Sequence, residues 1–573
     1  MKRHAVLLVL LAACADATSS SGGPSLGGAK DTTQFPSAAD LDKLRAREKP
    51  ALKFAETVRD VGDWKLVGPL ATTLSDDAAL ASTLWEKTLL AAVAKRSGLW
   101  TMGKDMQCAA RELGRYYLEK NGSPPGPLKD FITGRCGSTG VSLQTSWVEG
   151  DPNGASDERL FEAWRDDVKK QIDHFAAAPR SIGVFYGRKG NKAVIFLASV
   201  ERKATITPMS LVPAADGTVT VEGEVLQHYN RVSAHINRGE FSYADCTMDL
   251  SVLLPKFRFF CPADPKDTAA WIDVSAWEPG RYLGAVIAGV LALPKGTAAA
   301  PAAFVSQRLA AAAKQLSTTA AFLDRVNVVR SAAKLAPMEL EEQQSALSAE
   351  LAPFYFAAQF GEIEETISDK VALGVMAGWS VGVPIVDGDF TSSYLGGAKD
   401  PAAMVAALMA RPHGRETLLK PLATRLAVGV LEAKEGASLG AIVASYVPSS
   451  TIALDKETDT FIDRVNAERK KRGKPEITAQ TLVDTEESEV RQALATHKWT
   501  PRQALDRLLQ GRVSQRRQGL RGWEMIGEST ATLGLPAEIL DIERLVLTIV
   551  VGKQRDRKGP WERVVALVTI EPE

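Results

Sequence analysis

Apolar residues alternate with polar or small residues in three pairs of short segments spread along the chain, and each pair predicts a β-hairpin. The first pair lies within 181–200 and is joined by Arg188-Lys189-Gly190-Asn191, a glycine-containing turn. The other two pairs lie within 425–446 and 545–570. Stretches with apolar residues at helical spacing precede each hairpin. The pattern predicts an α+β protein that repeats one plan, with helices first and a hairpin last.

The helical stretches ahead of the second and third hairpins are also similar in sequence. Residues 322–330 and 461–469 share six identical residues in place, namely Phe, Asp, Arg, Val, Asn and a final Arg. Two unrelated amphipathic helices are the alternative explanation. The agreement at both ends of each segment, helix and hairpin, favours a repeated domain.

Residues 204–296 have a different texture, in which apolar residues alternate over short runs. Val219, Val221 and Val225 have the spacing of one face of a strand, and Phe257 and Phe259 have the same spacing. Turn pairs such as Asp-Gly separate the runs. We therefore expect a small all-β sandwich, immunoglobulin-like in geometry, inserted between the first and second repeats.

Changes in composition place the boundaries between these parts. An alanine-rich stretch, 296–314, separates the first half of the chain from the second, and 448–458 separates the last two repeats. The expected domains are a signal peptide (1–13), a flexible tether (14–45), unit 1 (46–203), the β-sandwich (204–296), unit 2 (315–450) and a truncated unit 3 (457–573).

The first residues have the features of an export signal. Lys2, Arg3 and His4 precede an apolar run, 5–11, that is too short to span a bilayer. The run ends in Leu-Ala-Ala-Cys, which resembles a bacterial lipobox, so that cleavage leaves Cys14 as a lipidated N-terminus. A plain secretory signal with a cysteine there by chance is the alternative. We expect a cell-envelope lipoprotein, held by its lipid at the periplasmic side of the outer membrane or at the cell surface.

Four further cysteines form an even set, which in an oxidising compartment favours two disulfides. Proximity in the sequence makes Cys108 with Cys136 and Cys246 with Cys261 the simplest of three pairings, and four buried thiols are the alternative. Neither pair has the Cys-x-x-Cys spacing of redox or zinc sites. We therefore expect structural bridges.

Composition excludes some classes of function. The 573 residues carry 69 basic and 69 acidic side chains, so no net field would draw the chain to nucleic acid. No later stretch contains the 18 or so apolar residues of a membrane span. The usual motifs of hydrolases, nucleotide-binding proteins and zinc proteases are absent, and we expect no cofactor.

Several motifs together resemble the CAP superfamily, also known as SCP or cysteine-rich secretory protein domains. Its opening helix commonly reads Asn-x-x-Arg, which Asn327 with Arg330 and Asn466 with Arg469 match. Residues 411–421 resemble the family's His-Arg-x-x-Leu-Leu segment, and 526–531 resembles its Gly-Glu-Asn-Ile-Ala box. The resemblance implies α/β/α sandwich units in a secreted protein that binds a lipid, a glycan or another protein.

The resemblance also implies a cleft with two histidines and two acidic residues, and no unit contains that set. In unit 2 the family's histidine position holds Gly414, and His413 is displaced by one residue. In unit 3, His497 lies upstream of Glu524 and Glu528, and no histidine follows. These four residues, His413, His497, Glu524 and Glu528, are our candidates for ligand binding, and we expect no metal site and no catalytic residue.

Two functions remain in competition. The first is a binding or structural module made of degenerate CAP-like units and more likely not an enzyme. The alternative is a CAP-type hydrolase or metal-dependent peptidase that uses His497 and Glu528.

Overall fold

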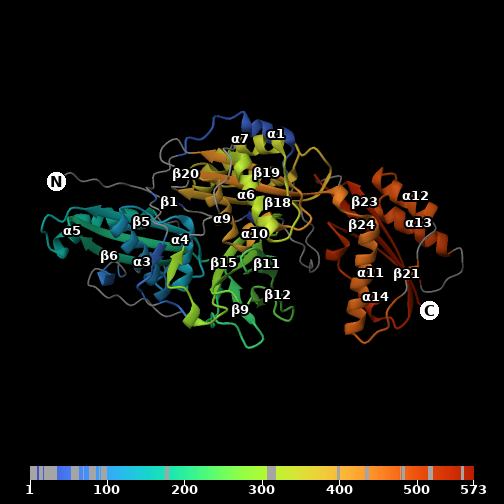
Figure 1. Cartoon of the computed structure of the whole chain (residues 1–573), viewed down its shortest axis with the longest axis horizontal. Helices are drawn as coiled ribbons and strands as arrows, with labels where there is room; N and C mark the ends of the chain where they lie inside the picture. The colour runs from blue at the N-terminus through green and yellow to red at the C-terminus, as the bar shows by residue number, and fades with distance from the viewer. Residues whose placement is uncertain are drawn as a thin grey trace.

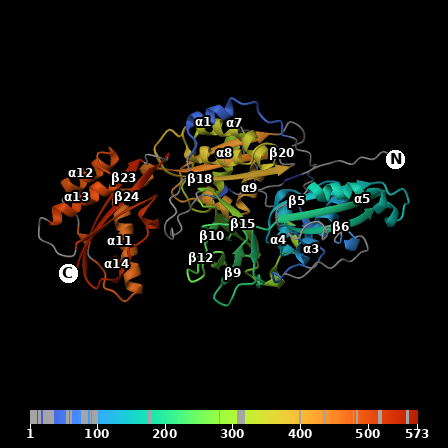
Figure 2. The same ribbon diagram turned by 180° about the vertical axis from the view of Figure 1, so that it is seen from behind.

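The computed structural model shows three α/β units and a β-sandwich, arranged from one end of the molecule to the other (Figure 1). It describes residues 10–11, 17–18, 35–52, 58, 63–68, 70–75, 86–88, 91, 100–174, 180–279, 281–305, 318–396, 400–432, 438–477, 479–480, 484–513, 520–555 and 560–572. Unit 1 and unit 3 lie at opposite ends, and unit 2 and the sandwich lie between them in both views (Figure 2). The chain is thus α+β, with several separate sheets.

Unit 1 is a sheet with helices on both faces. Even-numbered residues of its central strand, such as Phe196, pack towards α3, whereas odd-numbered residues, such as Ile195, pack towards α5. This division follows from the alternation of side chains along a strand. The elements are β4 (Trp100–Thr101), α3 (Lys104–Lys120), α4 (Gly126–Arg135), β5 (Val141–Gly150), α5 (Asp157–His174), β6 (Arg180–Lys189) and β7 (Lys192–Glu201).

Residues 204–292 form two β-sheets around one apolar core. One sheet has the order β12-β13-β9-β8, and the other has β11-β10-β14-β15-β2, in which β2 (Ala17–Thr18) of the N-terminal segment pairs with β15. The strands are β8 (Ala204–Ile206), β9 (Thr218–Val225), β10 (Arg231–Arg238), β11 (Ser242–Asp245), β12 (Thr247–Met248), β13 (Lys256–Pro262), β14 (Ala270–Trp277) and β15 (Gly284–Ala292).

Unit 2 follows the sandwich and again places helices on both faces of a sheet. Its core is divided between one cluster under α7 and α8 and another under α6 and α9. The elements are α6 (Thr318–Ala332), β17 (Glu339–Leu340), α7 (Glu342–Gln359), α8 (Thr366–Ala377), β18 (Ile385–Gly396), α9 (Pro401–Met409), α10 (Pro412–Leu419), β19 (Arg425–Glu432) and β20 (Ser438–Pro448).

Unit 3 repeats this plan, with the same order of strands in its sheet. Its core lies partly under α12 and α13 and partly under α11 and α14. After η2 (Ser449–Thr451) come α11 (Leu454–Lys471), β21 (Ala479–Gln480), α12 (Asp484–Ala495), α13 (Pro501–Val513), β22 (Arg521–Gly527), η3 (Thr530–Thr532), α14 (Ala537–Asp541), β23 (Leu545–Arg555) and β24 (Glu562–Pro572).

The strand order is the same in all three units. The strands common to the three sheets read β4-β6-β7-β5, β17-β19-β20-β18 and β21-β23-β24-β22, and the first strand of each is parallel to its neighbour. In unit 1, β1 (Leu10–Leu11) also pairs with the outer edge of β5. The second strand of each sheet in this order, β6, β19 or β23, contains a glycine where a helix packs closely on the sheet. These glycines are Gly183, Gly429 and Gly552. A Cβ on Gly183 would lie 1.9 Å from the Met106 carbonyl oxygen of α3, and one on Gly429 would lie 2.3 Å from the Ser348 backbone of α7. The close packing of helix on sheet therefore requires glycine.

The Asn-x-x-Arg residues of units 2 and 3 hold each first helix to its own unit. Arg330 is fully buried and donates hydrogen bonds to the carbonyl oxygens of Ala336, Leu418, Lys420 and Ala423. Arg469 makes the equivalent set with Pro475, Ile539, Ile542 and Glu543. The amides of Asn327 and Asn466 bond to the backbone of Met338 and Ile477. The repeated motif is therefore structural.

The N-terminal segment contains a helix where the sequence predicted only a tether. Ser37 and Asp40 form a capping box at the start of α1 (Ala38–Arg45), and Leu41 and Leu44 are buried against unit 2. The predicted tether, 14–45, therefore extends too far along the chain. The remaining short elements are β1 (Leu10–Leu11), β2 (Ala17–Thr18), β3 (Asp63–Lys65), η1 (Thr297–Ala299) and β16 (Ala303–Val305).

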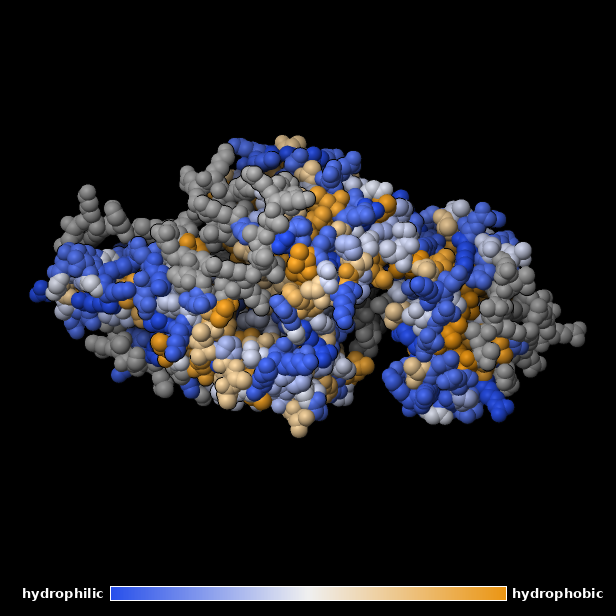
Figure 3. Space-filling model, viewed as in Figure 1, coloured by the Kyte–Doolittle hydropathy of each residue, from blue (hydrophilic) through white to orange (hydrophobic). Residues whose placement is uncertain are grey.

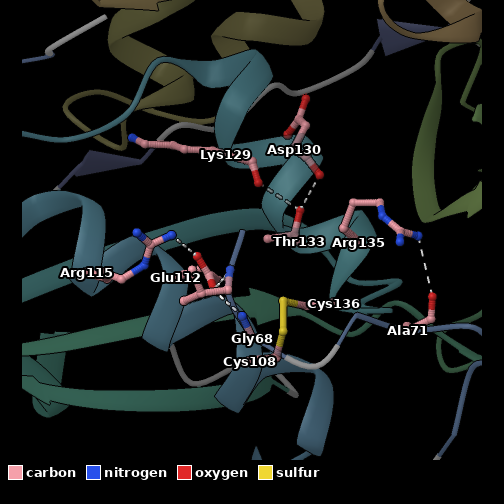
Figure 4. The surroundings of a disulfide bond; sticks show 11 residues. Gly68, Ala71, Cys108, Glu112, Arg115, Lys129, Asp130, Thr133, Arg135 and Cys136 are labelled. Carbon is pink, nitrogen blue, oxygen red and sulfur yellow. Dashed lines mark hydrogen bonds and ion pairs between the residues drawn. A yellow bond between two sulfur atoms is a disulfide. The ribbon is translucent and has the colours of Figure 1, made fainter. Parts of the chain in front are cut away.

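Both predicted disulfides are present. Cys108 of α3 is bonded to Cys136, the residue that caps the end of α4 (Figure 4). Nearby, the buried Glu112 accepts hydrogen bonds from the Val67 and Gly68 amides, which attaches the preceding segment to unit 1. Cys246, between β11 and β12, is bonded to Cys261 of β13 and fixes the crossing between the two sheets. Each bridge adds about 2–4 kcal/mol by restricting the unfolded chain.

The surface shows apolar residues in several separate patches among hydrophilic ones (Figure 3). Within the part of the chain that the structure describes, no helix has the length and apolar character needed to cross a bilayer. Cys14 and most of the predicted signal peptide lie outside the described residues.

Candidate functional site

Helix α10 joins unit 2 to the sandwich through several buried polar side chains. It is the segment that resembles the CAP His-Arg-x-x-Leu-Leu motif, and Pro412 starts it at a position where the missing amide costs nothing. Its residues are almost all buried, including the polar residues His413, Arg415 and Glu416. Buried polar side chains need partners, and here the sandwich provides several of them.

Asp273 of β14 is the central partner. It is 1% exposed, pairs with Arg411 and accepts a hydrogen bond from Nδ1 of His413 at 3.2 Å. Burial by itself raises the pKa of Asp273, but the adjacent Arg411 and His413 outweigh it and hold that pKa below its usual value. The carboxylate is therefore ionised, and it ties two α10-region side chains to the sandwich.

Arg415 makes a second set of contacts across the same junction. Its guanidinium donates to the carbonyl oxygen of Met409 and to those of Gly239 and Ser242 in the sandwich. Burial lowers the pKa of Arg415 to about 10. Asn237 adds a hydrogen bond from its amide to the Ala410 carbonyl oxygen at 2.8 Å. The junction therefore uses backbone acceptors as well as charges.

His235 of β10 is also buried at this junction, and its ring lies 3.2 Å from Asp245. Burial by itself lowers the pKa of His235. The carboxylates of Glu416, Asp245 and Asp273 have the larger, opposite effect, and together they raise this pKa to about 9. The imidazole is therefore protonated near neutral pH and acts as a cation among carboxylates.

The polar cluster continues into unit 2. Lys420 is paired with Asp387, and Thr417 lies 3.4 Å from Asp389, both at the start of β18. Asp387 and Asp389 are almost fully buried. Acidic and basic groups thus alternate from the sandwich through α10 into the sheet of unit 2.

A cavity of about 100 Å³ lies beside this cluster, where unit 1, the sandwich and unit 2 meet. Arg411 and His413 are on its wall, together with residues of α4, β5, β14, β18 and α9. Arg411 lies over the ring of Trp271 at 4.0 Å from the centroid. A Cβ on Gly289 would come within 2.7 Å of the guanidinium, so glycine at this position makes room for Arg411. The lining residues with side chains are Pro127, Lys129, Asp130, Thr133, Ser138, Val141, Ser142, Leu143, Val200, Trp271, Phe360, Ser392, Ser393, Tyr394, Leu395, Ala407, Leu408, Ala410, Arg411 and His413.

The structure places the four candidate residues in two separate regions. His413 is at the cavity. His497 lies in the turn after α12 in the left-handed conformation, with φ of 55°, and its Nδ1 is buried without a hydrogen-bond partner. Glu524 is exposed on β22, and Glu528 faces Arg563 at 3.7 Å. Within the described ranges, no hydrogen bond or ion pair joins His497 to either glutamate.

The sequence did not reveal Asp273, Arg411, His235 or Glu416 as members of the site. Asp273 sits in an alternating strand, and only its polar character at an inward position distinguishes it. His235 is buried, whereas His228, seven residues earlier, is exposed. No group of three or more His, Cys, Asp or Glu side chains suited to a metal ion occurs among the described residues.

Comparisons with known proteins add little to this geometry. No protein-family model and no curated protein matches the chain. Among solved structures, the chain is similar to a cysteine-rich secretory protein from Staphylococcus aureus at 8% sequence identity. That match covers 46% of this chain and 85% of that chain at a TM-score of 0.17, a likeness that carries no argument about function.

Proposed function

We propose that this protein is a lipid-anchored, non-catalytic binding module of the cell envelope, built from CAP-like units and an immunoglobulin-like sandwich. The observation that carries the proposal is the cavity between unit 1, the sandwich and unit 2, whose one histidine is hydrogen-bonded to the buried Asp273. Pockets between domains are common sites for small ligands. The ligand would contact all three domains at once.

The state of His413 supports binding rather than acid-base chemistry. A general base needs a nitrogen that reaches the substrate proton, together with a group that orients the ring. His413 is 6% exposed, and the carboxylate of Asp273, which orients its ring, also forms an ion pair with Arg411 that balances its charge. The side chains therefore serve the junction between domains.

Two features support the assignment to CAP-like units. Each unit has helices on both faces of a mainly antiparallel sheet, with one strand order. The Asn-x-x-Arg helix also recurs in units 2 and 3 with the same buried contacts. These features agree with the resemblance that the sequence motifs suggest.

The anchor rests on the lipobox-like sequence at Cys14. A diacyl group together with an N-acyl chain gives stable membrane attachment, whereas a single acyl chain gives only marginal attachment. We expect Cys14→Ser to move the protein from the membrane to the soluble fraction, with Cys108→Ser as a control that keeps the anchor. Membrane retention of Cys14→Ser would contradict the anchor.

The cavity is tested by blocking it. A mixed panel of small polar, acidic and apolar compounds is screened against the protein by ligand-observed NMR. Ala407→Phe places a ring in the cavity and should abolish the binding found, whereas Ala495→Phe, on the exposed end of α12, should leave it unchanged. Binding that persists in Ala407→Phe, or a panel with no binder at all, would contradict the proposal.

A further inference from the structure

Residues 35–45, which we call the strap, contact three other parts of the chain. The ring centroid of Phe35 lies 5.1 Å from that of Tyr282, between β14 and β15 of the sandwich, and 5.0 Å from that of Trp561, directly before β24 of unit 3. The rings of Tyr282 and Trp561 are themselves 5.7 Å apart, and all three pairs meet edge to face. Phe35 therefore completes a triangle of rings in the geometry that aromatic side chains prefer.

The rest of the strap lies on unit 2, where α1 packs beside α7 and α8 (Figure 2). The indole N–H of Trp379 donates to the carbonyl oxygen of Pro36 at 2.9 Å. Leu41 is 1% exposed, and a Cβ on Gly374 of α8 would lie 2.5 Å from one of its methyl carbons, so the glycine makes room for the leucine. These contacts on unit 2 position Phe35 between the sandwich and unit 3.

Trp561 is the side chain of unit 3 that enters the core of unit 2. It is fully buried in the cluster under α7 and α8, and its indole N–H donates to the carbonyl oxygen of Met376 in α8 at 3.3 Å. A Cβ on Gly388 of β18 would lie 3.3 Å from the indole ring and 2.3 Å from the Met376 oxygen. Unit 2 thus encloses the indole together with the rings of Phe35 and Tyr282.

The polar contacts between units 2 and 3 gather at the same place, around η2. The Ser449 hydroxyl donates to Glu562, the residue after Trp561, and the Lys553 ammonium group donates to the Ser449 carbonyl oxygen. One apolar cluster also continues from unit 2 into unit 3, but a notch separates the lower part of unit 3 from the sandwich in the view of Figure 3. Attachment along one side favours a hinge at η2, and Phe35 lies against that hinge.

We propose that the strap is a latch on the hinge between unit 2 and unit 3. With the strap docked, Phe35 completes the enclosure of Trp561 and unit 3 keeps the orientation shown in Figure 1. When the strap leaves, α1 unfolds, because its eight residues fall short of the roughly 12–15 that an isolated helix needs in water. One side of Trp561 then opens, and unit 3 gains freedom to rotate. The latch does not depend on the cavity or on the proposed binding function.

Small-angle X-ray scattering and hydrogen–deuterium exchange test the latch. Both are measured on the full-length chain with Cys14→Ser, which removes the predicted lipid and the need for detergent. In Phe35→Ala we expect the radius of gyration to rise. Exchange in 35–45 and in the hinge segments 449–453 and 560–563 should become about tenfold faster, the effect of losing a buried aromatic contact. Exchange in α12 and α13 should not change.

Phe260→Ala is the matched control, because Phe260 lies on β13 at 38% exposure and should affect neither readout. Leu44→Ala tests the latch away from the rings, since Leu44 of α1 is buried against unit 2. It should accelerate exchange at the hinge as well, and it takes the place of Phe35→Ala if that variant loses its fold by circular dichroism. Trp561→Phe should in turn accelerate exchange in the strap, because the coupling between two sites is reciprocal.

Two results would overturn the inference. If exchange rises only within 35–45 and the radius of gyration equals that of the control, unit 3 is held by its own contacts and the strap is a passive cover. If exchange rises equally throughout units 2 and 3, the strap contributes to overall stability and is not a latch on the hinge.

Discussion

Units 2 and 3 share a plan, but they differ in the segment that precedes the last hairpin. In unit 2 this segment forms α9 and α10, and α10 carries the side chains that bind the sandwich. In unit 3 it forms the short η3 and α14, and Thr530 of η3 bonds to Glu457 of its own unit. The same fold therefore docks another domain in one copy and closes on itself in the other.

The comparison separates two kinds of residue. The Asn and Arg of the first helix recur in both units because they bind backbone groups within each unit. Asp273, Arg411 and Arg415 connect only unit 2 to the sandwich. Internal repetition in the sequence therefore identifies residues that hold the fold, and the docking residues lie outside the repeat.

The largest expected effect comes from replacing the buried arginines. Arg330→Met should destabilise unit 2, and Arg469→Met unit 3, by about 3–5 kcal/mol, because each leaves several buried carbonyl oxygens without a donor. Calorimetry should show one transition lowered in each variant, and limited proteolysis should identify the unit concerned.

Arg472→Met is the matched control, since this exposed arginine follows α11 and forms an ion pair with the exposed Asp541 at the surface. It should change stability by less than about 1 kcal/mol. A loss of only that size in Arg330→Met or Arg469→Met would contradict the structural role of the motif.

The next effect is a dependence of thermal stability on pH in the sandwich and unit 2. His235 has a pKa of about 9 in the folded protein, above the unfolded value of about 6.5, so its contribution is fully present below about pH 6.5. The contribution is lost as the pH rises towards 9, and it amounts to at most about 3 kcal/mol. The calorimetric midpoint of this part should fall over that pH range, and that of unit 3 should fall less.

Replacing His235 by Gln should remove most of this alkaline fall, whereas replacing the exposed His228 by Gln should leave it in place. An alkaline fall that is equal in the wild type and His235→Gln would rule out the histidine as its source.

The smallest effect distinguishes the two asparagines. Asn327 bonds to Met338 at 3.0 and 2.8 Å, whereas the corresponding distances from Asn466 to Ile477 are 3.5 and 2.8 Å. Asn327→Ala should therefore cost about 1–2 kcal/mol and Asn466→Ala somewhat less. Chemical denaturation of the two variants in parallel would measure both losses of stability. A larger loss of stability in Asn466→Ala than in Asn327→Ala would contradict this prediction.

Much of the fold was predictable because its signals are local. The alternation in 181–200 and the Gly-Asn turn suffice for the β6–β7 hairpin, and the repeated Phe-to-Arg segment identifies α6 and α11. The Ser37 and Asp40 capping box was also present in the sequence, but the polar segment around it concealed α1.

The site was less predictable because its members come from distant parts of the chain. Asp273 and His413 are 140 residues apart, and each is ordinary in its local sequence. Only tertiary packing brings them together, and the sequence offers no periodicity that relates a strand of the sandwich to α10. The resemblance did point to His413, but as a remnant of a cleft rather than as a contact between domains.

Hydrogen–deuterium exchange on Asp273→Asn tests most directly whether α10 docks the sandwich through this carboxylate. Removing the charge leaves the half-buried Arg411 and the buried His413 without their anionic partner. The account predicts faster exchange in α10, β10 and β14, and unchanged exchange in α11, β23 and β24. Unchanged exchange in α10 and β14, or an equal increase in unit 3, would contradict it.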